Sequence, residues 1–390
     1  METVLDNVAG RAGLGGVTLA AAYHHGRDIF PHNPKRRVHF LEGGTVFFQP
    51  DTARYQGRVL QPLVSELARE SDVLAGLCSA AHARSMRVRA WTVFLHNYSL
   101  GEAHPDCASR NVFGDRHVTD LCPSNPEVRT YAAALAADIA AKGVDVVVAE
   151  SLHFHGLEHG FHHERYFIEL GPLGRYLLGL CFCEHCLAAA REHRVDVDHL
   201  ERAVRLELER RFAATPDPEP AELERGDVEA FADGELGGYL ETRAATVSSL
   251  VKECAEAAPL ALIDLSGAIK GYATGRPVGA AAPSIGWQFG IDVSAIAESC
   301  QVEAIGYAAD PERLRFDLDG YRSLAGDKNL SVIMRPMAPD CDSAGNLAQK
   351  LEVARAAGCT ETGFYHYGFM RLESLDLIRA ALDAAGYPAR

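Results

Sequence analysis

The segment "AAKGVDVVVAES", residues 140–151, carries the pattern that decides the fold. An alanine-rich helical stretch reaches Gly143, and glycine is the usual residue just beyond the end of a helix. The run "VDVVVA" (144–149) is apolar without strict alternation, which is typical of a parallel strand buried on both faces. Glu150 follows directly. The segment therefore predicts a helix and then a strand that places a carboxylate at the edge of a parallel sheet.

The same alternation of strand and helix recurs along the chain. Amphipathic segments rich in Ala, Leu, Glu and Arg separate eight apolar runs, at residues 16–23, 37–44, 88–97, 144–151, 260–267, 302–310, 330–339 and 361–369. Eight strand–helix units are the number found in a (β/α)8 barrel, the TIM barrel. We predict this α/β fold, as a single catalytic domain over residues 1–390. A doubly wound open sheet is the alternative.

Composition and charge restrict the class of protein. The chain has 390 residues, of which 47% are hydrophobic, and this is enough for a large core. Its formal net charge of −15 argues against nucleic acid or an anionic membrane as a partner. The first residues contain no basic region followed by a long apolar run, so we expect no signal peptide, no membrane span and a cytoplasmic location. A homo-oligomer is compatible with the sequence, but no interface is readable.

An insertion separates the fourth and fifth predicted strands. Residues 152–238 far exceed what one crossover helix needs, so we predict an insertion at the C-terminal mouth of the barrel. It contains the cysteine-rich run "LCFCEHC" (180–186), a charged helical stretch (198–212) and an acidic, proline-containing loop (215–227). Long loops at this face of a barrel usually serve the active site.

The insertion contains three cysteines, Cys181, Cys183 and Cys186, within a stretch of six residues. In a reducing cytoplasm, clustered cysteines favour a metal or redox site over disulfides. A redox pair is usually a lone C-x-x-C, so the third cysteine favours structural zinc, with redox chemistry and unliganded thiols as alternatives. Tetrahedral zinc requires a fourth ligand, for which His185 and Cys122, in "LCPSNPEVR" (121–129), are candidates.

The order of these motifs is similar to that of a known family. "CPSNPEVR", a helix, a strand ending in Glu and then C-x-C-x-x-C resemble glycoside hydrolase family 42, the β-galactosidase group, over residues 120 to about 190. The resemblance implies a (β/α)8 barrel with a structural zinc held by Cys122, Cys181, Cys183 and Cys186. Four thiolates leave no open coordination position, so such a zinc would fix the insertion in place and take no part in the chemistry.

Glu150 is the first candidate for catalysis. Barrel active sites lie at the carboxyl ends of the strands, and glycoside cleavage needs two carboxyl groups, one of them protonated. An apolar strand end raises the pKa of a carboxyl group and suits a general acid. The resemblance assigns the acid/base role to the same position, although the family has Asn before it and this chain has Ala149. A structural ion-pair role for Glu150 is the alternative.

The second carboxylate departs from the family pattern. The resembling family has its nucleophilic Glu at the end of the seventh strand, where "VIMRPMAPD" (332–340) places Arg335. Asp264 and Asp310 are the substitutes, and we prefer Asp264 because it follows a buried strand. Asp310 precedes Pro311 and would equally cap a helix. Arg335 suits a carboxylate or phosphate, and hence an acidic sugar.

Polar and aromatic side chains at the other strand ends are predicted to bind substrate. They are Tyr23, His24, His96, Asn97, His153, Trp287, Tyr307, Arg335, Tyr365 and His366. The histidine-rich loop "HFHGLEHGFHH" (153–163) is interrupted by glycines. We therefore interpret its histidines as contacts to sugar hydroxyls or solvent rather than as a second metal site.

These observations predict a glycosidase-like hydrolase that processes a small-molecule carbohydrate by carboxylate acid/base catalysis. One alternative is a metal-dependent sugar isomerase or lyase, with Glu150, Asp264 and mouth histidines as ligands of a hard cation. The other is a non-catalytic sugar-binding barrel, which the missing Glu of the seventh strand suggests.

Overall fold

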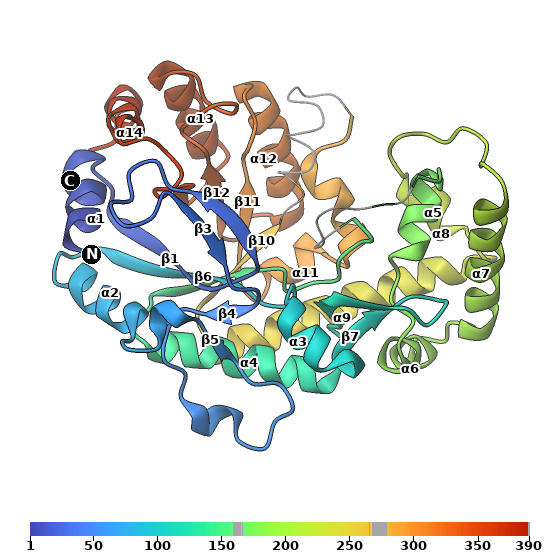
Figure 1. Ribbon diagram of the computed structural model, residues 1–390. Helices are drawn as coiled ribbons and strands as arrows, with labels where there is room; N and C mark the ends of the chain where they lie inside the picture. Colours follow the sequence, from blue (N-terminus) through green and yellow to red (C-terminus); the bar gives the residue numbers. More distant parts are fainter. Residues whose placement is uncertain (159–164, 166, 265, 267–278, 389–390) are drawn as a thin grey trace.

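A computed structural model of the protein describes residues 1–158, 165, 167–264, 266 and 279–388. Its centre is a nine-stranded sheet with the order β13-β12-β11-β10-β9-β6-β1-β4-β5 (Figure 1). The strands are β1 (Gly16–Tyr23), β4 (Thr45–Val46), β5 (Leu63–Val64), β6 (Arg87–Val93), β9 (Val146–Glu150), β10 (Leu260–Asp264), β11 (Gln301–Ile305), β12 (Leu330–Met334) and β13 (Glu361–Phe364). Pairing is parallel from β13 through to β1, whereas β4 joins β1 in the antiparallel sense.

Seven of the eight predicted strands form this parallel run. The prediction for the second, residues 37–44, is wrong. In the segment 37–44, β3 (Val38–Leu41) pairs with β2 (Gly26–Ile29) in a separate antiparallel hairpin. Their residues alternate between exposed and half-buried, as in a ribbon covered on one face only. Within the described residues, no pairing joins β13 back to β1 or β5. The mostly parallel α/β sheet is thus established, while a closed barrel stays a prediction.

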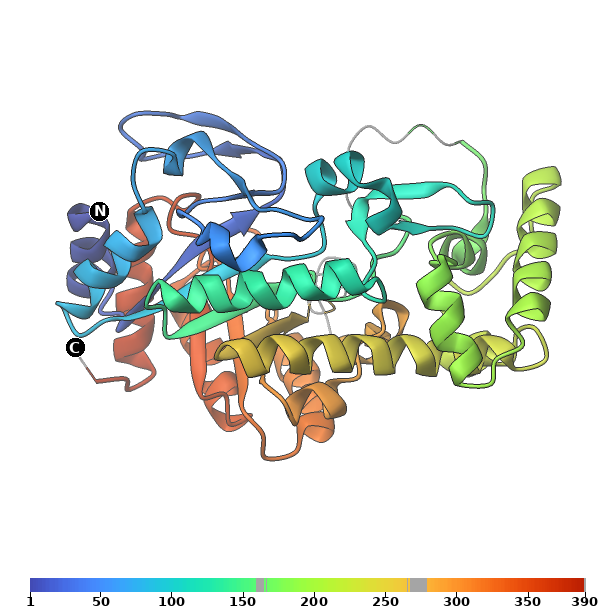
Figure 2. The same ribbon diagram turned by 90° about the horizontal axis from the view of Figure 1, so that it is seen from below.

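Helices pack along the outside of the sheet (Figures 1 and 2). They are α2 (Val73–His82), α4 (Pro126–Ala141), α9 (Glu235–Ala257), α11 (Val293–Ala297), α12 (Pro311–Ala325), α13 (Ala344–Ala356) and α14 (Glu373–Ala384). The short helix α1 (Glu2–Asp6) lies beside α14 (Figure 1), and Arg11 and Asp376 form an ion pair between these two ends of the chain.

Helix α4 shows how the quoted segment folds. The side chain of Asn125 accepts a hydrogen bond from the Glu127 amide, and Pro126 occupies the first helical turn, where its missing N–H costs nothing. Gly143 has a φ of +94°, a left-handed conformation that other residues adopt only at a cost. The chain therefore turns sharply from α4 into β9, as the sequence predicts.

Alternate residues of each strand face opposite sides of the sheet. Val146 and Val148 face inward, as do Ala261 and Ile263 of β10, and they form one inner cluster. Their neighbours Val147, Ala149, Leu260 and Leu262 belong instead to the larger core shared with the helices. Because Glu150 has the same parity as Val146 and Val148, its side chain projects into the concave interior.

An ion cluster crosses this interior. The guanidinium of Arg89, on β6, donates two hydrogen bonds to the carboxylate of Glu303, on β11, and both side chains are almost completely buried. Arg89 Nε also lies 3.7 Å from a carboxylate oxygen of Glu361, on β13. Because β9 and β10 separate β6 from β11, the sheet must be strongly curved for these groups to meet.

The inserted segment lies to one side of the sheet (Figure 1). It contains α5 (Gly171–Leu178), α6 (Glu184–Glu192), α7 (Val197–Ala213) and α8 (Arg225–Glu229). The long helix α9 runs from this segment to the sheet (Figure 2), and its Tyr239 hydroxyl donates to the Cys181 carbonyl. An antiparallel ribbon, β7 (Ala108–Arg110) and β8 (Arg116–Leu121), packs beside it. The boundary of the insertion at 152–238 remains a prediction.

Among the helices that the structure describes, none combines the length and apolar character needed to cross a bilayer.

Replacing Arg89 with Met should destabilise the fold by about 3–5 kcal/mol, because it leaves the Glu303 carboxylate buried without its main partner. Urea unfolding of Arg89→Met measures this cost. The double variant Arg89→Met/Glu303→Leu should recover most of it, since both buried charges are then absent. Arg87→Met is the matched control: this side chain is 56% exposed and should contribute under about 1 kcal/mol. Equal losses for the Arg87 and Arg89 variants would contradict the assigned role.

Candidate functional site

A cavity of about 380 Å³ opens at the carboxyl ends of the strands. Apart from Trp91, its polar lining residues end a strand or follow one closely, as expected where parallel strands present their carboxyl ends at one edge. The lining consists of Tyr23, Trp91, Glu150, Ile305, Tyr307, Arg335, Met337, Ala338, Tyr365 and Phe369. The structure thus brings together five of the predicted site residues: Tyr23, Glu150, Tyr307, Arg335 and Tyr365.

Glu150 is the acidic residue of this lining. Its side chain is buried, and the indole N–H of Trp91 donates a hydrogen bond to one carboxylate oxygen. Burial raises the pKa of Glu150, while the positive field of His24 and the Trp91 hydrogen bond oppose the rise. The carboxyl group is therefore placed to hold a proton at higher pH than an exposed glutamate would.

Two tyrosines lie next to Glu150. The hydroxyl groups of Tyr23 and Tyr365 are 3.4 Å apart, and both rings line the cavity. Burial raises the pKa of Tyr365 to about 12 and that of Tyr23 well above its ordinary value, with the Glu150 charge adding to both. Both hydroxyls consequently stay protonated and can donate hydrogen bonds to a ligand.

Arg335 is the cationic residue of the lining. Its Nε donates to a carboxylate oxygen of Asp340, and its Cζ lies 4.2 Å from the centre of the Tyr307 ring. These two contacts fix the plane of the guanidinium in the wall of the cavity. A cation, Arg335, thus lines the cavity near the position where the resemblance implies a nucleophilic Glu.

Asp264, predicted as the second carboxylate, lies elsewhere. It shares the parity of Leu260 and Leu262, so it faces the helices and not the cavity. One of its oxygens accepts hydrogen bonds from the amide and hydroxyl of Ser266, and the other accepts from the hydroxyl of Tyr321 on α12. Asp264 does end a buried strand, as the sequence predicts, but the alternation along β10 directs its side chain toward the helices.

Asp310 has the capping role that the sequence left open. Its carboxylate accepts a hydrogen bond of 2.9 Å from the Glu312 amide at the start of α12. A carboxylate at this position satisfies an amide that the helix itself leaves unpaired. Asp310 does not line the cavity.

Histidines form a layer behind Tyr23. The ring of His24 stacks on Tyr23 at 4.4 Å, and the ring of His96 lies 5.1 Å from that of His24. Asp120 connects His96 to His155: its Oδ1 is 3.4 Å from Nδ1 of the first and 3.3 Å from Nδ1 of the second. His24 and His96 thus support the cavity wall from behind.

The remaining predicted binding residues also lie outside the lining. Asn97 caps helix α3 (Tyr98–Ala103) by accepting from the Leu100 amide. His153 and Trp287 are buried, and the Trp287 ring packs at 5.3 Å from Tyr176. His366 stacks on Phe369 of the lining at 4.3 Å, and burial lowers its pKa to about 4. His159, His162 and His163 fall outside the described residues.

Trp91, Met337 and Phe369 were missed because only strand ends were considered in the sequence. Trp91 lies within β6, two residues after Arg89, and therefore on the same inward face. Period-2 alternation along β6 was the signal that could have identified it. Met337 and Phe369 lie in the loops after β12 and β13, where sequence periodicity gives no direction for a side chain.

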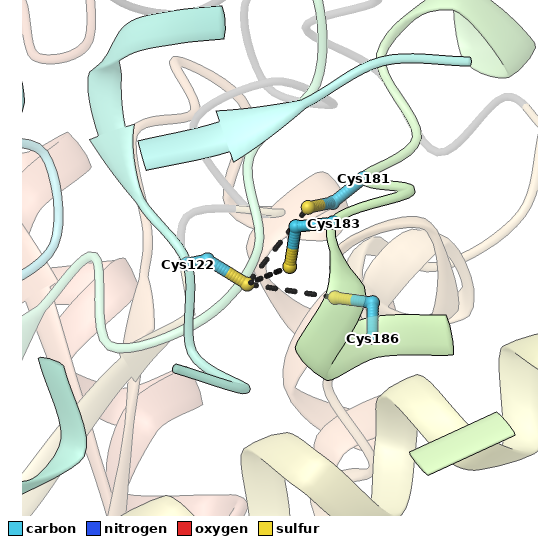
Figure 3. Close-up of side chains that lie close together, drawn as sticks. All are labelled: Cys122, Cys181, Cys183 and Cys186. Carbon is cyan, nitrogen blue, oxygen red and sulfur yellow. Dashed lines mark hydrogen bonds between the residues drawn. The ribbon is translucent and has the colours of Figure 1, made fainter. Parts of the chain in front are cut away.

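The four cysteines converge as predicted (Figure 3). Cys122 follows β8, Cys181 and Cys183 precede α6, and Cys186 lies within it. The Cys122 sulfur is 3.5 Å from those of Cys183 and Cys186 and 3.8 Å from that of Cys181. A ZnS₄ tetrahedron with Zn–S bonds of about 2.3 Å has S···S edges of about 3.8 Å, whereas a disulfide is near 2.05 Å. The buried quartet therefore fits a metal ion.

Polar groups contact two of the sulfur atoms of the quartet. The Arg110 amide donates to the Cys181 sulfur at 3.3 Å, and the Ser124 hydroxyl lies 3.2 Å from the Cys186 sulfur. Hydrogen bonds among the four thiols lower the pKa of Cys181 well below its usual value and leave those of Cys122 and Cys186 raised. The backbone donor at Cys181 orients that sulfur and stabilises its charge.

Comparisons with known proteins support the fold. No protein-family model and no curated protein matches the chain. Among solved structures, β-galactosidase from the psychrophilic Marinomonas ef1 is similar with a TM-score of 0.52 and 12% identity, over 97% of this chain and 56% of that one. Alpha-L-fucosidase isoenzyme 2 from Paenibacillus thiaminolyticus has a TM-score of 0.50 and 12% identity, over 98% of this chain and 46% of that one. The chain spans about half the length of these enzymes and shares their fold.

The purified protein should contain one zinc per chain bound by four sulfurs, which elemental analysis with X-ray absorption spectroscopy measures. Cys183→Ser should lower the zinc content and the melting temperature, because one thiolate of a closed site is lost. Cys359→Ser, outside the quartet, is the matched control and should leave the zinc content unchanged. Absence of metal, or nitrogen atoms in its ligand shell, would contradict the assignment.

Proposed function

We propose that the protein is a hydrolase-like enzyme that processes a glycoside, with Glu150 as general acid. The observation that carries the proposal is Glu150 itself, a buried carboxyl group at the end of β9 in a cavity lined by aromatic rings. The cavity volume falls within the range of small-molecule sites, roughly 300–1,000 Å³. The fold shared with two glycosidases and the resemblance over residues 120–190 support the same class.

The lining residues have complementary roles in this proposal. Protonated Glu150 gives its proton to the oxygen of the departing group as the glycosidic bond breaks, and water adds to the anomeric carbon and releases a proton to solvent. The Trp91 N–H then stabilises the carboxylate that remains. Tyr23 and Tyr365 donate hydrogen bonds to sugar hydroxyls, while the rings of Trp91 and Phe369 pack against the apolar face of the sugar.

The four cysteines play a structural part. We propose that Cys122, Cys181, Cys183 and Cys186 hold a zinc ion that links the end of β8 to the insertion. Such an ion has no open coordination position for substrate. Among the described residues this quartet is the one group of His, Cys, Asp and Glu side chains close enough to bind a metal. A sugar isomerase that uses a hard cation therefore has less support than a glycosidase.

A non-catalytic sugar-binding protein is the second candidate. It is favoured by one observation: Glu150 is the single carboxylate among the described lining residues, and Arg335 lies near the position of the resembling family's nucleophile. Two carboxyl groups are the usual requirement for glycoside cleavage. Sugar binding by the wild-type protein without turnover would support this candidate over the enzyme.

Glu150→Gln should reduce turnover by about 10²–10⁴-fold, because the amide cannot give a proton to the leaving group. The measurement is kcat/KM on a panel of 4-nitrophenyl glycosides that includes α-L-fucoside, β-D-galactoside and β-D-glucuronide. Asp310→Asn is the control, since Asn also caps helices well and should retain activity. Full turnover by Glu150→Gln would refute the assignment.

Trp91→Phe should move the alkaline limb of the pH–activity profile to higher pH. The Trp91 N–H favours the ionised form of Glu150 and so lowers its pKa; its removal raises that pKa further. A general acid then stays protonated to higher pH. The kcat/KM profile of the variant and the wild-type protein tests this, and an unchanged limb, or one shifted to lower pH, would count against Glu150 as the proton donor.

A further inference from the structure

We propose that the carbohydrate bound in this cavity is acidic, and that Arg335 binds its carboxylate group. The ligand class is thus a uronic acid or its glycoside. The inference deepens the proposed function and rests on it, because it concerns the same cavity.

Arg335 is built into the cavity wall as a fixed cation. Its side chain is 17% exposed, with Asp340 bonded to Nε and the Tyr307 ring beneath the guanidinium plane. Holding a guanidinium in a partly buried site costs solvation energy, which a ligand carboxylate can offset. A guanidinium presents five N–H donors in a rigid fork, and a carboxylate matches two of them at once. A neutral sugar hydroxyl cannot make this paired contact with the same strength.

Asp340 already pairs with this guanidinium from within the wall. Across the cavity, Glu150 is the other ionisable acid or base among the described lining residues, apart from the tyrosines. Burial raises its pKa and so favours its uncharged form, as a general acid requires. The buried hydroxyls of Tyr23 and Tyr365 are likewise protonated. The guanidinium of the Arg335–Asp340 pair therefore faces neutral hydrogen-bond donors among the described lining residues, an arrangement suited to a ligand carboxylate.

The hairpin next to the cavity adds a second, independent observation. Residues 26–41, the β2–β3 hairpin, contain four cationic side chains and one acid, Asp28, in a chain of net charge −15. The cationic residues Arg27, Lys35, Arg36 and Arg37 are all exposed.

The turn of this hairpin, residues 30–37, packs on the loop after β13 that contributes Phe369 to the cavity. Phe30 stacks on Phe369 of the lining at 5.8 Å, and His32 Nε2 lies 2.8 Å from the Tyr367 carbonyl. Exposed cationic side chains on a hairpin that contacts the cavity loop attract anions toward this side of an otherwise acidic protein.

Binding of matched sugar pairs tests the inference. Methyl β-D-glucuronide and methyl β-D-glucoside differ in one group, a carboxylate in place of a CH₂OH. The galacturonide and galactoside form a second pair. Titration calorimetry should show the better uronide binding at least tenfold more tightly than its neutral partner.

Arg335→Gln should reduce that ratio to within twofold. Arg335→Lys, which keeps the charge but loses the fork, should give an intermediate ratio. Arg191→Gln, in α6 and 56% exposed, should change nothing.

The outcomes separate this inference from the function it rests on. Equal binding within both pairs, or a preference retained in a folded Arg335→Gln, overturns the acidic ligand and leaves the glycoside-processing proposal standing. No binding of either pair together with no turnover of any aryl glycoside overturns both. Tighter binding of glucose 6-phosphate than of either uronide overturns the carboxylate in favour of a phosphate. Melting curves of the variants establish that each is folded.

Discussion

The ion pair between Arg89 and Glu303 crosses the inside of the sheet, and the shape of the sheet depends on it. Two strands separate the partners, so their contact exists only while the sheet is curved. Loss of this contact would leave each buried charge without its main partner, which costs several kcal/mol. The same curvature brings β1 and β13 near enough for Tyr23 and Tyr365 to meet at the opposite end.

The pairing of β6 with β9 relates the position of this ion pair to that of the cavity. Along β6, Arg89 pairs with Val146, Trp91 with Val148 and Val93 with Glu150 of β9. The interior is therefore charged at one end, apolar in the middle and hollow at the mouth. Every inward residue lies two positions from the next, so the position of Glu150 follows from that of the ion pair. The alternation of inward and outward side chains along β6 and β9 therefore places both the buried ion pair and the cavity residues.

The sequence predicts the parts of this molecule that local pattern controls. Strand β9, the glycine before it and the cysteine quartet are all readable, because turn chemistry and ligand type leave local signals. Residues 37–44 are misread because a short apolar run does not tell whether one face or two are buried. Asp264 and Trp91 are misplaced or missed for another reason: nearness to a strand end does not give the face to which a side chain points, which follows the alternation along β10 and β6. The resemblance, over residues 120 to about 190, reaches neither strand.

The cysteine quartet also determines when the candidate site can form. Cys122 and Cys181 are 59 residues apart in the chain, and α4, β9 and Glu150 all lie between them. A metal bound by the quartet would close a loop of this length as the chain folds, so part of its binding free energy would become folding free energy. During synthesis this closure becomes possible only after residue 186 has emerged, well after Glu150. If the quartet holds zinc, as proposed, the zinc supply would influence the yield of folded protein.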